Sequence, residues 1–141
     1  MRALYGPGPL DPAAVLLTPL ADLRAAGLSG AKAAAILDLA HHGAEGSLEL
    51  HRMGRMDDDA VIEQLVQVRG VGPWTAQMFL IFTLQRLDGW PTSDDGVRSG
   101  FALAYGRSER PSPKELEPLG DRFRPYRSVA AWSCWRAADS T

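Results

Sequence analysis

Apolar residues recur along most of this chain at intervals of three or four positions, which is the spacing of one face of an α-helix. No segment shows the strict alternation of apolar and polar residues that predicts a strand. With capping residues such as Asp11 and Ser29, the pattern predicts helices at about 12–17, 20–26, 29–42, 95–105 and 114–119, a turn of helix at 48–53 and a last helix from about 125. Residues 1–11, rich in glycine and proline, are predicted to be irregular. The sequence therefore indicates an all-α class and a single domain over residues 1–141.

The most regular part of the pattern surrounds a turn in the middle of the chain, Gly70-Val71-Gly72-Pro73. The apolar positions on its two sides are Val61, Leu65 and Val68 before it and Trp74, Met78 and Ile81 after it. Glycine allows the positive φ of a tight turn, and proline suits the first position of a helix, where its missing N–H costs nothing. The acidic run at 57–59 would cap the first of the two helices. The prediction is a helix-hairpin-helix motif over about 58–84.

The backbone of such a hairpin suits an anion. The amides of the turn and the N-terminus of the second helix face outward with partial positive charge, so a DNA backbone phosphate is a natural ligand. The same residues also fit an ordinary corner between two helices of an all-α core, in which the glycines only make the turn. The local pattern leaves both interpretations open.

The charge of the chain limits how it would bind DNA. The net charge is −2, and 13 of the 15 basic residues are arginines. A protein that coats DNA is strongly basic, so any contact here has to be local, through backbone amides, a helix end and a few arginines. The single Cys134 excludes an internal disulfide and a cysteine-only metal cluster, and the three histidines lack metal-ligand spacing. No apolar run has the length of a membrane span, and we expect a cytoplasmic protein.

A family resemblance rests on four blocks that occur in this order: LRAAGLSGAKAAAILDLA, LVQVRGVGPWTAQMFLIF, WPTSDDGVRSGF and FRPYRSVAAWSCW. Together they resemble the helix-hairpin-helix DNA glycosylase superfamily, most closely its DNA-3-methyladenine glycosylase II family. The resemblance implies that family's all-α fold. It also implies a base-excision repair hydrolase that cleaves the N-glycosidic bond of alkylated purines, such as 3-methyladenine, in double-stranded DNA. The alternatives are a non-catalytic helix-hairpin-helix DNA-binding module, an inactive truncated glycosylase and, more weakly, a helical protein–protein module.

The resemblance also assigns a catalytic residue. The family pattern Pro-x-x-Asp-x-x-Val-Arg-x-Gly, followed without gaps from Pro91, puts Asp94 at the catalytic position, with Asp95 as the alternative. A carboxylate at a helix N-terminus stays ionised, because the helix end favours the anion. It can then stabilise the positive charge that develops on the sugar and orient the attacking water. Without the resemblance, Asp94 would be taken as a plain helix cap.

Further site residues follow from the same resemblance. It implies that Trp74, Met78 and Trp135 line the pocket for a base flipped out of the duplex. An electron-rich indole would hold a cationic alkylated purine by about 0.5–2 kcal/mol of cation–π attraction. Core packing is the alternative for each tryptophan, and it is what we expect of Trp132.

The resemblance places the DNA backbone on the hairpin, at Gly70, Val71, Gly72 and Thr75. It implies a monovalent cation held by the backbone carbonyls of Val66, Val68 and Val71, and no other cofactor.

Two absent features and one departure from the family pattern narrow the expected activity. Trp74 stands where lyase members of the superfamily carry a lysine, and one cysteine cannot supply the four of the iron–sulfur branch. We therefore expect a monofunctional glycosylase without a metal cluster. Residues 1–19 match none of the family's opening helices, so we expect an N-terminally short member, monomeric and with no membrane contact.

Overall fold

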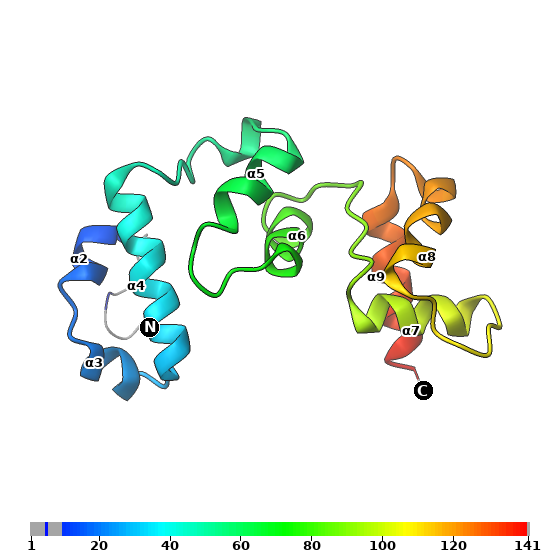
Figure 1. Ribbon diagram of the computed structural model, residues 1–141, viewed down its shortest axis with the longest axis horizontal. Helices are drawn as coiled ribbons and strands as arrows, with labels where there is room; N and C mark the ends of the chain where they lie inside the picture. Colours follow the sequence, from blue (N-terminus) through cyan, green and yellow to red (C-terminus); the bar gives the residue numbers. More distant parts are fainter. Residues whose placement is uncertain (1–4, 6–9, 141) are drawn as a thin grey trace. The chain divides into compact units, whose positions relative to one another are not determined.

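The computed structural model describes residue 5 and residues 10–140, and within them it contains helices and no β-strand (Figure 1). The all-α prediction is confirmed. The chain divides into two compact units, Met1–Pro73 and Trp74–Thr141, each of which has its own internal packing. The single domain over 1–141 stays a prediction. The irregular segment predicted for 1–11 falls mostly outside the described residues. None of the described helices is long and apolar enough to cross a membrane.

The first unit contains α2 (Pro12–Leu16), α3 (Leu20–Ala25), α4 (Gly30–Glu45), the 3-10 turn η1 (Met53–Arg55) and α5 (Asp58–Leu65). The predicted helix starts are confirmed by caps: Asp11 accepts from the amide of Ala13 at 3.1 Å, Ser29 from that of Lys32 at 3.3 Å, and Asp57 from that of Ala60 at 2.8 Å. The helix turn predicted at 48–53 is a 3-10 turn that begins only at residue 53.

Gly43 and Gly46 both mark the end of this helix in the sequence, and α4 continues past the first of them. A Cβ at Gly43 would lie 3.4 Å from the side chain of Pro12, which is an ordinary van der Waals contact where α2 and α4 pack together. The helix ends at the second of them, Gly46, whose φ of +75° is the left-handed conformation that glycine adopts without strain.

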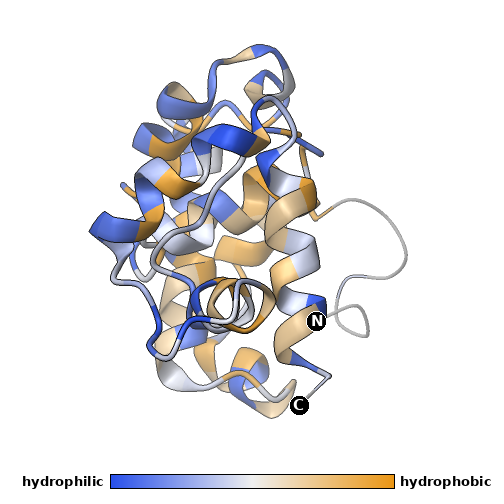
Figure 2. Cartoon of the chain, turned by 90° about the vertical axis from the view of Figure 1, so that its right-hand side faces the viewer, coloured by the Kyte–Doolittle hydropathy of each residue, from blue (hydrophilic) through white to orange (hydrophobic). Residues whose placement is uncertain are grey.

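The second unit contains α6 (Pro73–Phe82, less its first residue), α7 (Asp95–Ala104), α8 (Pro113–Leu119), the 3-10 turn η2 (Asp121–Phe123) and α9 (Arg127–Ala138). Its core cluster consists of Trp90, Val97, Phe101, Leu116, Ala131 and Cys134. The helices carry apolar and polar positions side by side, as amphipathic helices around a small core require (Figure 2). Helix α8 begins with a reciprocal capping box between Ser112 and Glu115.

Two glycines of α7 allow α9 to pack directly against the α7 backbone. A Cβ at Gly100 would lie 1.8 Å from the carbonyl oxygen of Cys134, and a Cβ at Gly96 would lie 2.7 Å from Cδ1 of Trp135. No larger residue fits at Gly100 without moving a helix. This close approach brings Trp135 on α9 next to the first turn of α7.

A cluster of polar contacts fixes the loop that leads to α7. Asp88 accepts hydrogen bonds from Nε of Arg127 at 2.7 Å and from Nη1 of Arg124 at 2.7 Å. The hydroxyl of Ser128 accepts from the amide of Gly89 at 2.9 Å. The hydrogen bond from Arg127 is the main cause that lowers the pKa of Asp88, and it outweighs the opposing effect of burial. These contacts tie the loop to the start of α9.

Candidate active site

Asp94 is the N-cap of α7. Its Oδ1 accepts the amide of Val97 at 2.8 Å, which satisfies one of the free N–H groups at the start of that helix. The backbone at Asp94 is extended, with φ −75° and ψ 124°, as an N-cap requires. The capping role that the sequence offered as the plain alternative is therefore present in the structure.

Two tryptophans donate hydrogen bonds to the same carboxylate. Nε1 of Trp74, on the first turn of α6, donates to Oδ2 of Asp94 at 2.8 Å. Nε1 of Trp135, near the end of α9, donates to Oδ1 at 2.7 Å. Three segments of the second unit thus converge on one carboxyl group, and a simple helix cap needs neither indole.

The hydrogen bonds determine the charge of Asp94. Partial burial by itself raises the pKa of a carboxyl group, because it disfavours the charged form. The hydrogen bonds from the amide of Val97, the two indoles and the amide of Gly96 outweigh this effect, so the pKa of Asp94 lies below its usual value. The side chain is therefore an anion at neutral pH, placed beside two aromatic rings.

An apolar face of α6 continues the site. Trp74, Met78 and Phe82 are four residues apart, so they lie on one face of the helix. The ring of Phe82 stacks on that of Trp135, with centroids 5.5 Å apart and planes 29° apart. Phe82 was not predicted as a site residue. The spacing 74, 78, 82 was a signal for it in the sequence.

Asp95, the alternative catalytic residue, has different surroundings. It is the first residue of α7 and exposed, and its carboxylate forms ion pairs with Arg98 at 3.1 Å and with Arg110 at 3.7 Å. No indole hydrogen bond to Asp95 occurs in the described residues. Its charge is compensated by arginines, whereas Asp94 receives only neutral donors.

The hairpin loop connects α5 to α6, and in the described structure it is held on α4. Gly70 has a φ of +80°, as predicted for the turn. Gly72 does not need a positive φ, and a Cβ built on it meets nothing within 4 Å. The amide of Arg69 donates to Oδ2 of Asp38 on α4 at 2.7 Å. The fold therefore requires glycine at position 70 but leaves open space at position 72.

The remaining residues predicted on the hairpin differ in exposure. Thr75 is exposed on the first turn of α6, and Val71 is partly buried. Val68 is buried, and its carbonyl accepts the amide of Val71 at 3.0 Å. A carbonyl has a second lone pair, so this hydrogen bond leaves Val68 able to ligate a cation as predicted. The cation site, with Val66 and Val71, stays a prediction.

Trp132 corrects one expectation. It was predicted to pack in the core, but 54% of its surface is exposed. On α9 the buried positions are Ser128, Ala131 and Cys134, and Trp132 is not among them. The helical spacing of the tryptophans alone did not reveal which of them faces inward.

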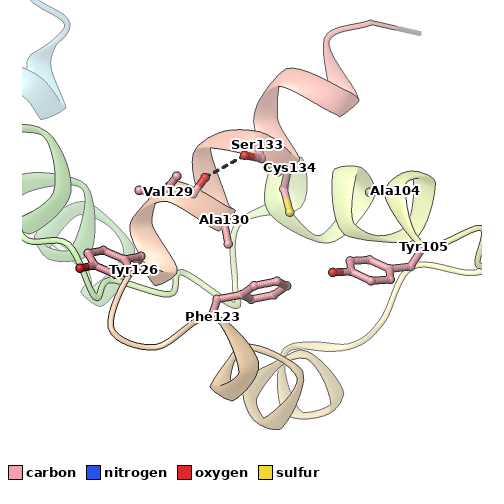
Figure 3. A pocket seen from close by; sticks show the side chains of 8 residues that line it. All are labelled: Ala104, Tyr105, Phe123, Tyr126, Val129, Ala130, Ser133 and Cys134. Atoms are coloured by element: carbon pink, nitrogen blue, oxygen red, sulfur yellow. Dashed lines mark hydrogen bonds between the residues drawn. The ribbon is translucent and has the colours of Figure 1, made fainter.

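A cavity of about 560 Å³ lies on the other side of α9 (Figure 3). Its lining residues are Ala104, Tyr105, Phe123, Tyr126, Val129, Ala130, Ser133 and Cys134. At 100° per residue, those on α9 lie opposite Trp135, so the cavity is separate from the Asp94 site. Burial raises the pKa of the Cys134 thiol to about 11, which keeps the thiol protonated and a poor nucleophile at neutral pH.

The all-α architecture and the hairpin define a protein of the helix-hairpin-helix type, and similarity to known proteins makes this more specific. The putative DNA-3-methyladenine glycosylase YfjP of Bacillus subtilis is 30% identical over 84% of this chain and 41% of its own length. DNA-3-methyladenine glycosylase 1 of Schizosaccharomyces pombe is 29% identical over 82% of this chain and 51% of its own length. The chain thus spans about half the length of these curated relatives or less. No model of a known protein family matches it.

Two solved structures of related glycosylases are similar to this chain in fold. The DNA-3-methyladenine glycosidase of Bacillus halodurans has a TM-score of 0.86 at 33% identity and covers 97% of this chain and 63% of its own. The 3-methyladenine DNA glycosylase Mag1 of S. pombe, solved in complex with abasic DNA, has a TM-score of 0.85 at 26% identity, covering 96% of this chain and 66% of its own. The chain belongs to the helix-hairpin-helix DNA glycosylase superfamily.

Proposed function

We propose that this chain is a monofunctional DNA glycosylase that hydrolyses the N-glycosidic bond of alkylated purines, such as 3-methyladenine, in double-stranded DNA. It acts as a monomer and in the cytoplasm. The observation that carries the proposal is the ionised carboxylate of Asp94, held by the indole N–H groups of Trp74 and Trp135. The names of the relatives reported above support the same chemistry.

The reaction needs a negative charge close to the sugar. The bond between C1′ and the base nitrogen breaks, its electron pair leaves with the base, and positive charge develops on the sugar. Water then attacks C1′ and releases a proton, which leaves an abasic site and the free base. Asp94 stabilises the positive sugar electrostatically. Because its pKa is lowered, it is a weak base, so the proton passes on to solvent and the carboxylate remains charged for the next turnover.

The two oxygens of Asp94 are not equivalent. Oδ1 already accepts from Val97 and Trp135, and a carboxylate oxygen offers about two lone-pair positions. Oδ2 accepts from Trp74 and retains room for a further partner. We therefore assign Oδ2 as the oxygen that faces the sugar and orients the attacking water.

The aromatic rings supply base recognition. Trp74 is 47% exposed, so a ring face is available to a flipped base. Phe82 covers one face of Trp135 and holds its ring in place. Alkylated purines such as 3-methyladenine are cationic, and an indole face attracts a cation by about 0.5–2 kcal/mol. Met78, one turn after Trp74 on α6, adds a polarizable side chain to the same face.

The hairpin supplies the DNA contact. The backbone around Val71, Gly72 and Thr75 presents amides at the start of α6, and position 72 has open space where a phosphate would approach. The monovalent cation would be held by the carbonyls of Val66, Val68 and Val71, where it would add positive charge beside the same phosphate. No other cofactor enters the proposal.

The experiment measures release of methylated bases from a duplex treated with a methylating agent, by the wild-type chain and by Asp94→Asn and Asp95→Asn. Asparagine keeps an oxygen that caps α7, so Asp94→Asn should fold and bind DNA while excision is lost. Asp95→Asn is the matched control and should retain excision. Loss in Asp95→Asn alone would move the catalytic role to the neighbouring residue. Salt-dependent DNA binding without excision in the wild type would identify a non-catalytic DNA-binding module.

A further inference from the structure

Arg69 lies at the tip of the hairpin loop, directly before the left-handed Gly70. Its backbone amide donates to Oδ2 of Asp38 at 2.7 Å, and Asp38 belongs to α4, 31 residues earlier in the chain. The Cβ of Ala35, one turn before Asp38, lies 3.5 Å from the Cβ position of Gly70. The backbone of Arg69 is thus fixed at two adjacent points of α4.

The side chain of Arg69 has no such partner. It is exposed, and its guanidinium takes part in no hydrogen bond or ion pair within residue 5 and residues 10–140. By contrast, Arg52, Arg98 and Arg127 are paired with carboxylates. A guanidinium carries five donors in a planar fork that matches phosphate oxygens, and it stays charged at any relevant pH. The hairpin therefore presents a free, permanent cation on a fixed backbone.

The position of Asp38 beside the hairpin loop is unfavourable for DNA binding by its charge alone. A carboxylate beside a loop that contacts DNA repels the phosphates, and here His42 stands 3.6 Å from it as a partial counter-charge when protonated. What Asp38 provides is an acceptor for the amide of Arg69. Because this hydrogen bond fixes the Arg69 amide, it also restricts the orientation of the neighbouring loop residues.

We propose that the guanidinium of Arg69 contacts a backbone phosphate of duplex DNA, and that Asp38 is a positioning residue that holds Arg69 for this contact. The proposal rests on DNA binding through the hairpin, which is part of the proposed function. The backbone amides near Gly72 and the Arg69 side chain then act together on the sugar–phosphate backbone. Such a contact sets affinity and register but carries no base specificity.

The test measures the affinity of an undamaged duplex between 50 and 200 mM KCl, for the wild type and for Arg69→Ala, Arg69→Lys and Arg24→Ala. Removing one phosphate contact should lower the slope of log K against log salt by about 1 and weaken binding equally for all sequences. Lysine keeps the charge and should restore most of the slope. Arg24 is an exposed arginine on α3 and serves as the matched control, with no change expected. A wild-type slope in Arg69→Ala, or an equal fall in Arg24→Ala, would overturn the proposal.

Two Asp38 variants separate positioning from charge. Asp38→Asn keeps an oxygen for the Arg69 amide and removes the negative charge, so affinity should be equal or higher. Asp38→Ala removes the acceptor and should weaken binding, and Asp38→Asn should restore it. Weaker binding in both variants, or in neither, would contradict a positioning role. If the wild type and Gly72→Leu both bind DNA without salt dependence, the proposed function itself fails, and this inference fails with it.

Discussion

The distance between α7 and α9 is set by Gly100, and a single methyl group there tests how the site is built. In Gly100→Ala the new Cβ would lie 1.8 Å from the carbonyl oxygen of Cys134 and 2.8 Å from its Cα. These are backbone atoms, so no side-chain rotation relieves the clash. The helices have to separate by more than about 1 Å, because protein interiors have no spare volume of this kind.

The separation has a cost in stability and a cost in catalysis. Overpacking a tight contact costs about 1–3 kcal/mol, and a clash with backbone belongs at the upper end, which for this chain length lowers Tm by about 10 °C. Trp135 lies one residue after Cys134, and its 2.7 Å hydrogen bond to Asp94 would lengthen beyond the hydrogen-bonding range. A misplacement of this size reduces turnover by about a hundredfold.

Thermal unfolding and single-turnover base release measure the two effects separately. The control is Gly30→Ala, at the first residue of α4, where a Cβ meets nothing within 4 Å. This variant should keep its Tm or gain slightly, because alanine restricts the unfolded chain. Wild-type Tm and turnover in Gly100→Ala would refute the argument that glycine sets the distance between these helices.

Three further predictions follow from the same contacts. Trp74→Phe and Trp135→Phe each keep an aromatic ring but remove a hydrogen-bond donor to the carboxylate, so the pKa of Asp94 should rise. The acidic limb of the plot of excision rate against pH should then move to higher pH. An unmoved limb would mean that the indoles act by stacking alone. Gly72→Leu should fold normally, since position 72 is open, and should weaken DNA binding for every sequence; unchanged affinity would place the DNA elsewhere. Asp88→Asn should cost about 1–2 kcal/mol in urea unfolding at pH 7. Because the pKa of Asp88 is lowered in the folded protein, its charge stabilises the fold above the pKa of the unfolded state, and this stability is lost as the pH falls through the pKa of the folded state. The difference in unfolding free energy between wild type and Asp88→Asn should therefore shrink in acid. A difference independent of pH would show that the charge of Asp88 is unimportant.

The sequence predicted the helices well because their ends depend on local capping residues. Asp11, Ser29 and Asp57 cap the helices that they were expected to cap. Two glycines, Gly43 and Gly46, mark the end of α4 in the sequence, and the helix continues through the first and ends at the second. The local pattern did not distinguish between them.

The site was predicted in part. Spacing from Pro91 led to Asp94, and the structure brings Trp74 and Trp135 to it. Their catalytic and base-binding roles stay predictions. The hydrogen bonds from both indoles to one carboxylate could not be foreseen from local patterns. That of Trp135 depends on how closely α9 approaches α7 at Gly96. The exposure of Trp132 was missed for the same reason, since the inward face of α9 is decided by packing.

The order of residues between the hairpin and the site has a mechanistic consequence. Only Pro73 separates Gly72, where we expect DNA to approach, from Trp74, which donates to Asp94. Pro73 has a restricted φ and begins α6. Because the two positions are so close in the chain, we expect a phosphate bound at the amide of Gly72 to change the environment of the Trp74 indole. Undamaged DNA should therefore affect Trp74 before any base is flipped. We expect an undamaged duplex to quench tryptophan fluorescence in wild type but not in Trp74→Phe. Equal quenching in both would show that DNA bound at the hairpin does not affect Trp74.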